Sequence, residues 1–374
     1  MKTPVWPLLL ALALLPTLPA WAGVETFYVG TYTGATGSQG IYVGTLDTDT
    51  GRLGPLRLAA AVEKDPTFLA LSPDHRFLFA ALSDGVASFA IRPDGTLNAI
   101  NRQPTGPNIC HVSLGRAGRE LFAAGYDAGT VSAFPVAADG TIGPRTAFIA
   151  LHGSGPNPDR QTGPHIHSVY ADPENRFLYA CDLGSDRIWI FRLAAHDRLT
   201  PANPPATIVA PGLGPRHLAF SPDGRQVYVA NELGVSTSTF RRNPTTGTLT
   251  LLDTEDNIPP GWPKGTGSGE IVMHPSGRWL VVSTRVEDMI TVFAIHHGFV
   301  PGPPLQRQQI VISPAKFPRS IALDPSGHWL LVAGQLDNSI AVMKIDPTSG
   351  QLTPTSECQS VGSPVCILFA PVPR

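Results

Sequence analysis

One phrase returns six times along this chain, and an internal repeat of this kind constrains the fold more than any other feature of the sequence. In each copy an apolar strand leads into a turn rich in proline, aspartate and glycine, and a second apolar strand follows. Two such strands form a β-hairpin, because those turn residues supply the backbone angles that a tight turn needs. The copies begin at Pro66, His111, His167, Arg216, Glu270 and Arg319.

A second short phrase, usually a glycine followed two residues later by an aliphatic residue, marks another hairpin in each unit. It occurs at Gly51, Gly95, Gly140, Arg198, Gly247, Gly298 and Gly350. The seventh unit is split between the termini. Residues 363–369 resemble a first strand without its hairpin partner, and residues 27–32 resemble a second strand without its first. We expect these two segments to pair and to complete the seventh unit.

Four strands and roughly 50 residues per unit are typical of a β-propeller, which avoids exposed sheet edges by radial repetition. We therefore predict an all-β fold, a seven-bladed β-propeller whose closing blade is shared between the N- and C-terminal strands. The composition agrees with this prediction, because 37 glycines and 38 prolines among 374 residues disfavour a helical protein. The formal net charge of −2 argues against a nucleic-acid partner.

Residues 1–22 resemble an export signal rather than part of the fold. Lys2 precedes an apolar run from Val5 to Ala20, and Ala20-Trp21-Ala22 fits the pattern of small residues before a cleavage site. The run is interrupted by prolines, among them Pro7 and Pro16, and is shorter than the roughly 20 residues of a spanning helix. We expect a signal peptide over 1–22, a single propeller domain over 23–374, a periplasmic or secreted location, and no membrane contact after cleavage.

The four cysteines do not indicate a disulfide pattern. They are Cys110, Cys181, Cys358 and Cys366. In an exported protein they allow three full pairings, yet a domain of this size folds without disulfides. Cys358 and Cys366 are the pair closest in sequence, and both disulfides and free thiols remain open.

Equivalent positions of different blades converge at the axis of a propeller, so the aligned repeats define two columns of neighbouring residues. The residues that begin the first strands are Thr67, Cys110, His167, Arg216, Gly269, Arg319 and Val365. The residues that follow the second strands are Tyr32, Ser83, Tyr126, Leu183, Glu232, Arg285 and Gln335.

Any one of these charges is typical of a solvated loop with its own partner. The set is harder to explain that way, because buried charge is costly unless it is paired or used. Three arginines against Glu232 predict a net positive pocket, and arginine favours carboxylate or phosphate groups. We expect a small anionic or polyhydroxylated ligand. The expected substrate-binding residues are Tyr32, Tyr126, His165, His217, Arg319 and Gln335.

Neither a metal nor a cofactor is expected. A metal site typically needs three or four ligands, and the chain offers His167 with at most a distant carboxylate. A histidine beside a carboxylate is better suited to proton transfer. The sequence contains no GxSxG nucleophile motif, no Ser-His-Asp order and no glycine-rich phosphate loop.

Five segments resemble the propeller lactonase family, which includes cofactor-independent 6-phosphogluconolactonases and fungal carboxy-muconate lactonizing enzymes. They are YVGTYTG from Tyr28, GPHIHS from Gly163, GPRHLAFSPDGRQVYVANEL from Gly214, HPSGRWLVVSTR from His274 and PRSIALDPSGHWLLVAGQ from Pro318. The resemblance runs from about Phe27 to the C-terminus. It implies a lactone-opening or lactone-forming activity without metal or cofactor.

For the muconate-cyclising branch, the resemblance implies a catalytic set of one histidine, one glutamate and two arginines. By motif position they fall on His167, Glu232, Arg216 and Arg285, all of which already belong to the two columns. A 6-phosphogluconolactonase works where sugar phosphates are, in the cytoplasm. An exported chain is better matched to an unphosphorylated aldonolactone or another carboxylated lactone.

Three functions therefore stay open. The leading hypothesis is hydrolysis of a sugar lactone: Arg216 and Arg285 hold the oxyanion or a carboxylate, while Glu232 or His167 activates water and the other returns the proton. A muconate-type lactonizing cycloisomerase would use the same residues. The third possibility is a non-catalytic exported propeller that binds a ligand or a protein, because a fold alone does not decide function.

Overall fold

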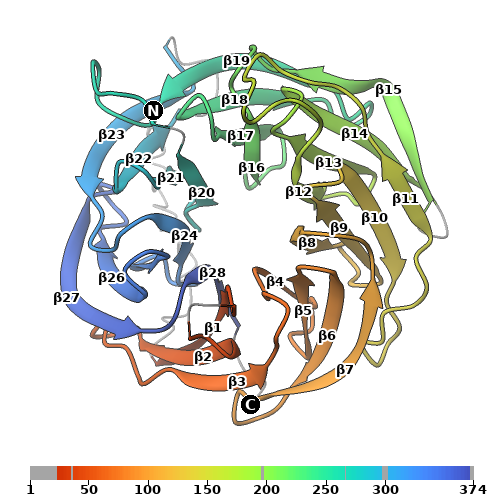
Figure 1. Ribbon diagram of the computed structural model, residues 1–374. Coiled ribbons are helices and arrows are strands. Elements are labelled where there is room, and N and C mark those ends of the chain that lie inside the picture. Colours follow the sequence, from red (N-terminus) through yellow and green to blue (C-terminus); the bar gives the residue numbers. More distant parts are fainter. Residues whose placement is uncertain (1–22, 35–36, 195–197, 266, 297–301, 371–374) are drawn as a thin grey trace, which may run out of the picture.

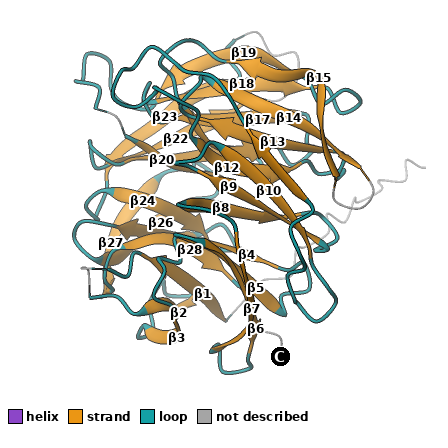
Figure 2. Ribbon diagram, turned by 45° about the vertical axis from the view of Figure 1, so that its right-hand side comes forward, coloured by secondary structure: helices purple, strands orange, loops and turns teal. Residues whose placement is uncertain are grey.

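The described residues form 28 β-strands in seven four-stranded antiparallel sheets arranged around a central axis (Figure 1). The computed structural model describes residues 23–34, 37–194, 198–265, 267–296 and 302–370. Within these residues it is strand, turn and loop with no helix (Figure 2). The predicted all-β, seven-bladed β-propeller is confirmed. The expected signal peptide, residues 1–22, lies outside the described part of the chain.

Each sheet is described from the axis outward. The blade that closes the ring contains β28 (Pro364–Phe369), β1 (Val24–Thr31), β2 (Gly40–Asp47) and β3 (Arg57–Ala61). The next two contain β4 (Phe68–Leu71), β5 (Phe77–Leu82), β6 (Gly85–Ile91) and β7 (Leu97–Pro104), then β8 (Ile109–Leu114), β9 (Glu120–Gly125), β10 (Thr130–Pro135) and β11 (Ala147–Ala150). The fourth and fifth contain β12 (Ile166–Ala171), β13 (Phe177–Asp182), β14 (Arg187–Ala194) and β15 (Arg198–Ile208), then β16 (Pro215–Phe220), β17 (Gln226–Asn231), β18 (Ser236–Arg242) and β19 (Leu249–Asp256). The last two contain β20 (Ser268–Met273), β21 (Trp279–Thr284), β22 (Met289–Ile295) and β23 (Leu305–Ile312), then β24 (Pro318–Leu323), β25 (Trp329–Gly334), β26 (Ser339–Ile345) and β27 (Leu352–Ser360).

The two ends of the described chain close the ring as predicted. The C-terminal strand β28 is the innermost strand of its blade and pairs antiparallel with the N-terminal strand β1. The register places Phe27 opposite Phe369 and Val29 opposite Ile367. In Figure 1 the blue strand β28 lies beside the red strand β1.

The hydrophobic core lies between neighbouring blades. Strands in the middle of a blade are covered on both faces, and every residue of β13 and of β21 is buried. Outer strands such as β19 and β27 expose many of their residues to solvent. Continuous apolar runs in the middle strands and polar outer strands are what this packing requires.

The glycines of the second phrase allow neighbouring blades to pack closely. Gly140 has φ +82° and lies against the ring of Phe77 in the preceding blade, where a β-carbon would collide with that ring. Gly247 makes the same contact with Phe177. Equivalent pairs are Gly51 with Trp329 and Gly350 with Trp279. The copy at Gly298 lies outside the described residues.

A β-bulge recurs where the inner strands begin. In β12, Ile166 pairs with Asp182 and Ser168 with Cys181, so His167 is an extra residue without a partner on β13. The same shift of register leaves residues of five other inner strands without a partner on the neighbouring strand. They are Cys110, Arg216, Arg319, Val365 and, in β20, the pair Gly269-Glu270. Bulges change the direction of side chains, and here they occur at the positions predicted to surround the axis.

The four cysteines are free thiols, so the pairing of Cys358 with Cys366 is absent. Cys358 is exposed on the outermost strand β27, whereas Cys366 is buried on the innermost strand β28 of the next blade. In the described part of the chain there is no helix with the length and apolar character needed to cross a membrane.

Candidate active site

The first residues of the inner strands meet in a pocket on the axis of the ring. Its lining residues are Thr67, Phe68, Cys110, His167, Arg216, His217, Glu270, Arg319 and Val365. All residues of the predicted first column except Gly269 belong to this lining. Gly269 lies beside the lining, with its carbonyl accepting Arg216 Nη1 at 2.6 Å, and the bulge in β20 leaves the neighbouring Glu270 on the pocket wall.

Glu232 organises the charges beside this pocket. Its carboxylate forms ion pairs with Arg216 Nε at 3.1 Å and Arg285 Nη2 at 2.9 Å, and it accepts a hydrogen bond from Arg160 Nη2 at 2.7 Å. His167 Nε2 lies 3.9 Å from Glu232 Oε2. The structure therefore brings together all four residues of the expected catalytic set and adds Arg160.

The arginines keep Glu232 ionised. Burial by itself raises the pKa of this carboxyl, but Arg285, Arg216 and Arg160 outweigh that effect and lower the pKa to about 2. Burial also lowers the pKa of Arg285 to about 10 although Glu232 opposes it. Burial and the nearby Arg319 likewise lower the pKa of Arg216. The cluster is a set of desolvated charges that are paired with one another.

His167 is a neutral histidine beside these charges. It is only 5% exposed, and its Nδ1 has no hydrogen-bond partner among the described residues. Burial, reinforced by Arg216, lowers its pKa well below the usual value. The ring is therefore uncharged at neutral pH, with Nδ1 buried and without a hydrogen bond among the described residues.

Half-buried residues form the rim above the pocket. Tyr126 stacks on His165, with ring centroids 4.5 Å apart, and contacts His167 edge to face. Arg160 Nη2 donates to Tyr126 Oη at 3.0 Å as well as to Glu232. The structure thus brings Tyr126 and His165, two of the expected binding residues, to one side of His167.

Arg319 is the cation that Glu232 does not neutralise. It lies over the ring of Tyr32, 5.7 Å from the centroid, and has no carboxylate within 4 Å among the described residues. Gln335 donates its backbone N–H to Phe317 O at 3.2 Å, and Phe317 packs against Arg285. Tyr32, Arg319 and Gln335 all remain partly accessible, as substrate-binding residues must be.

A second ring of residues follows the first, one position further along each inner strand. It contains Phe68, His111, His217 and Glu270. The ring of His217 lies 5.0 Å from that of His167 and 5.3 Å from that of His111, centroid to centroid. His217 Nδ1 donates to Glu270 Oε1 at 2.8 Å. His217 was an expected substrate-binding residue, whereas Glu270 was absent from the expected site.

Comparison with known proteins agrees with this geometry. Residues 26–369 match the family model described as a lactonase with a 7-bladed β-propeller. The chain belongs to this family. The 6-phosphogluconolactonase of Bacillus subtilis is 32% identical over 348 residues, which cover 91% of this chain and 97% of the relative.

Solved structures of similar proteins cover nearly the whole chain. The periplasmic gluconolactonase of Pseudomonas aeruginosa has a TM-score of 0.87 and 33% identity, over 94% of this chain and 100% of the other. A putative 6-phosphogluconolactonase from Bacteroides fragilis has a TM-score of 0.85 and 32% identity, over 94% and 99%. Membership of the lactonase family supports an enzyme of the lactonase type.

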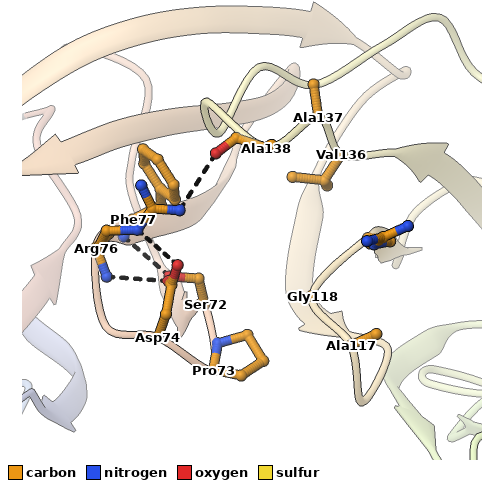
Figure 3. Close-up of a pocket in the computed structure, with 11 residues that line it drawn as sticks. Ser72, Pro73, Asp74, Arg76, Phe77, Ala117, Gly118, Val136, Ala137 and Ala138 are labelled. Atoms are coloured by element: carbon orange, nitrogen blue, oxygen red, sulfur yellow. Dashed lines mark hydrogen bonds and ion pairs between the residues drawn. The ribbon is translucent and has the colours of Figure 1, made fainter.

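A wider surface crevice does not contain a comparable cluster of charged groups and histidines. A crevice of about 460 Å³ lies at the hairpin turns of two neighbouring blades (Figure 3). Arg76 pairs with Asp74 at 2.6 Å and reaches Ala138 O at 3.3 Å, and Ser72 donates to Asp74 at 2.6 Å. Because these polar groups satisfy one another, the crevice offers little to a ligand, and the axial pocket is the candidate site.

The described residues contain no group of three or more histidine, cysteine, aspartate or glutamate side chains placed to hold a metal ion. The expectations of no metal and no cofactor stay predictions.

Proposed function

We propose that this protein is an exported lactonase that hydrolyses an unphosphorylated aldonolactone, with gluconolactone as the test substrate. The observation that carries the proposal is the cluster of His167, Arg216, Arg285 and Glu232 at and beside one axial pocket, in a chain of the lactonase family. The similar periplasmic gluconolactonase and the apparent export signal support the unphosphorylated substrate and a periplasmic location.

The arginines supply the electrostatic part of the reaction. Attack of water on a lactone carbonyl makes a tetrahedral oxyanion, which positioned donors must stabilise. Arg216 lies on the pocket wall and is held by Glu232 and by Gly269 O at 2.6 Å. Arg319, with no carboxylate partner among the described residues, faces the same pocket. In this mechanism Arg216 binds the developing oxyanion, and Arg319 binds a hydroxyl or acidic group of the substrate.

Glu232 acts by holding the arginines in place. A carboxyl with a pKa of about 2 is a weak base at neutral pH, and three guanidinium groups already occupy its oxygens. The proton that leaves the attacking water, and that the ring oxygen later needs, therefore falls to a buried histidine on the pocket wall. His167 and His217 are both placed for that task.

The test is release of acid from gluconolactone above its spontaneous hydrolysis, by purified protein treated with EDTA. We expect turnover by the wild type and a loss of about 100-fold or more in Arg216→Gln, because a positioned oxyanion donor contributes that much. Parallel assays with 6-phosphogluconolactone decide the substrate. A higher kcat/KM for the phosphorylated lactone would contradict the unphosphorylated substrate, and no turnover of either would contradict the lactonase.

A further inference from the structure

His167 and His217 differ in what lies behind their rings. His217 Nδ1 is 2.8 Å from Glu270 Oε1, so its N–H points at a carboxylate and its Nε2 keeps a lone pair. His167 Nε2 is 3.9 Å from the nearest Glu232 oxygen, which is too far for a hydrogen bond. A carboxylate that accepts the Nδ1–H of a histidine fixes the tautomer and stabilises the imidazolium. Only His217 has this support.

His217 keeps one ring nitrogen without a hydrogen bond, and its side chain is part of the pocket wall. His217 is 2% exposed, lines the axial pocket, and its Nε2 has no hydrogen-bond partner among the described residues. The space enclosed by the pocket-lining side chains is about 10 Å³, which is room for about one water molecule. A buried acceptor nitrogen beside a space of that size is suited to bind and deprotonate one water.

Glu270 is itself held in place. Its Oε1 also accepts the backbone N–H of Ile271 at 3.1 Å, and its own N–H donates to Ser283 Oγ at 3.0 Å. Burial raises the pKa of Glu270, but His217 outweighs burial and lowers it, so the carboxylate is ionised. The β20 bulge and these bonds keep the carboxylate behind His217.

Several charged or titratable groups face His217 from other strands. They are Glu270 on β20, His111 on β8, His167 on β12 and Arg319 on β24, with Arg216 next to it on β16. Burial lowers the pKa of His217, Glu270 raises it again, and Arg216 lowers it. Among these groups, Glu270 is the one that favours a protonated His217.

We propose that His217 is the base of the hydrolysis and that Glu270 is the positioning residue that sets its tautomer. The inference rests on the proposed lactonase function. His217 Nε2 takes a proton from water as the water oxygen bonds to the carbonyl carbon. When the bond between that carbon and the ring oxygen breaks, the imidazolium gives the same proton to the ring oxygen. The product is the open hydroxy acid, and His217 is neutral again.

The experiment compares His217→Gln and Glu270→Gln with the matched control His274→Gln, a buried histidine in the hairpin turn after β20 that is not part of the axial pocket lining. We expect His217→Gln to lower kcat for gluconolactone by about 100- to 10,000-fold with little change in KM. Free imidazole should restore part of the rate of His217→Ala. The control should stay within a few-fold of the wild type.

The pH profile separates a base from a structural residue. The rate should rise with pH as His217 loses its proton. Because Glu270→Gln removes the charge that favours the protonated ring, that rise should move to lower pH while the plateau falls. A merely structural Glu270 would lower the plateau without moving the rise. If Glu270→Gln does not fold, Glu270→Asp keeps the charge and should retain the position of the rise with a reduced plateau.

Three results would overturn the inference. If His217→Gln keeps wild-type kcat while Arg216→Gln loses it, the base lies elsewhere and the lactonase stands. If nitrogen-15 spectra show neutral His217 protonated at Nε2, the assigned tautomer is wrong whatever the activity. If the wild type hydrolyses no lactone, the proposed function fails and the inference fails with it.

Discussion

The ring around the axis has two unlike arcs. A charged arc is formed where β12, β16, β20 and β24 begin, and it carries His167, Arg216, Glu270 and Arg319. A neutral arc is formed by β28, β4 and β8, and it carries Val365, Thr67 and Cys110. β28 and β8 of the neutral arc carry the same bulge as β12 and β16 of the charged arc, so the bulge by itself does not distinguish the two arcs.

This difference gives a bound substrate an orientation. Under the proposed mechanism the lactone carbonyl faces Arg216 and His217, because the arginine and histidine side chains of the pocket lining all belong to the charged arc. The neutral arc can contact the part of the ligand that does not react. A propeller supplies seven equivalent positions, and chemistry needs only some of them, because the others still have to close the ring.

The largest loss of stability is expected from removing a strand of the neutral arc, although that arc carries no charge. Deleting residues 361–374 removes β28, the innermost strand of the closing blade, and leaves β1 with a free inner edge. Unpaired strand edges promote aggregation. We expect no soluble, cooperatively folded protein, as measured by size-exclusion chromatography and thermal unfolding. Removal of residues 372–374 is the control and should be harmless; a folded 1–360 protein would show that the ring closes in another way.

The charged arc should be most sensitive at Glu232. Glu232→Gln leaves buried Arg216 and Arg285 without their common carboxylate, and loss of one partner of a buried ion pair costs about 3–5 kcal/mol. Urea unfolding should show this loss, and kcat/KM should fall by about 100- to 1,000-fold as the donors lose their positions. Arg160→Gln is the comparison, because Arg160 is half-exposed and should cost no more than about 1 kcal/mol. Equal losses for both would contradict the central role of the carboxylate.

Acid should weaken the same cluster. The pKa of Glu232 is about 2 in the folded protein against an ordinary 4.5, so its stabilising contribution is complete above pH 4.5 and is lost as the pH falls toward 2. Between these limits the wild type should lose more unfolding free energy than Glu232→Gln, which has no proton to take up there. Parallel curves for the two proteins would mean that Glu232 is not the titrating group.

A smaller effect is expected at Arg319, which has no carboxylate partner to leave unpaired among the described residues. Arg319→Gln should raise KM by about 10- to 100-fold, the value of a hydrogen bond to a charged group, with stability nearly unchanged. The matched control is Arg225→Gln, an exposed arginine in a hairpin turn, which should alter neither. A large loss of stability in Arg319→Gln would indicate a structural cation instead.

The sequence predicts the blades, the ring closure and the residues around Glu232, because all of these depend only on the register of the repeats. His167, Arg216, Glu232 and Arg285 occupy equivalent places in different copies, and equivalent places converge. Their roles in a reaction stay predictions. The position of the pocket follows from the residues that begin the inner strands, one from each blade.

Two residues of the site, Arg160 and Glu270, could not be predicted from the aligned repeats, and the reasons are physical. Arg160 lies in the loop before β12, outside both aligned columns, and reaches Glu232 only through the folding of that loop. Glu270 lies one position after a column residue, where regular alternation along a strand would turn it away from the axis. The bulge breaks that alternation, so Glu270 lines the pocket; in β16 the bulge brings two successive residues, Arg216 and His217, to the pocket wall. A bulge is not visible in the hydrophobic pattern.

The smallest effect should come from Cys110, where the neutral arc meets the charged one. Burial raises the pKa of its thiol to about 12 even though Arg216 and Arg319 act in the opposite direction, and its Sγ donates to His167 O at 3.2 Å. A thiol in this state is a poor nucleophile at pH 8, since the thiolate is the reactive form. Native protein treated with iodoacetamide should therefore be alkylated first at exposed Cys358, with Cys110 far slower, as mapped by peptide mass spectrometry. Cys110→Ser keeps a donor to His167 O and should change kcat/KM by less than about threefold, within the range of substitutions away from special features. Rapid alkylation of Cys110 with loss of activity would show that the charged arc does activate its neutral neighbour, and the two arcs would then have to be treated as one reactive surface.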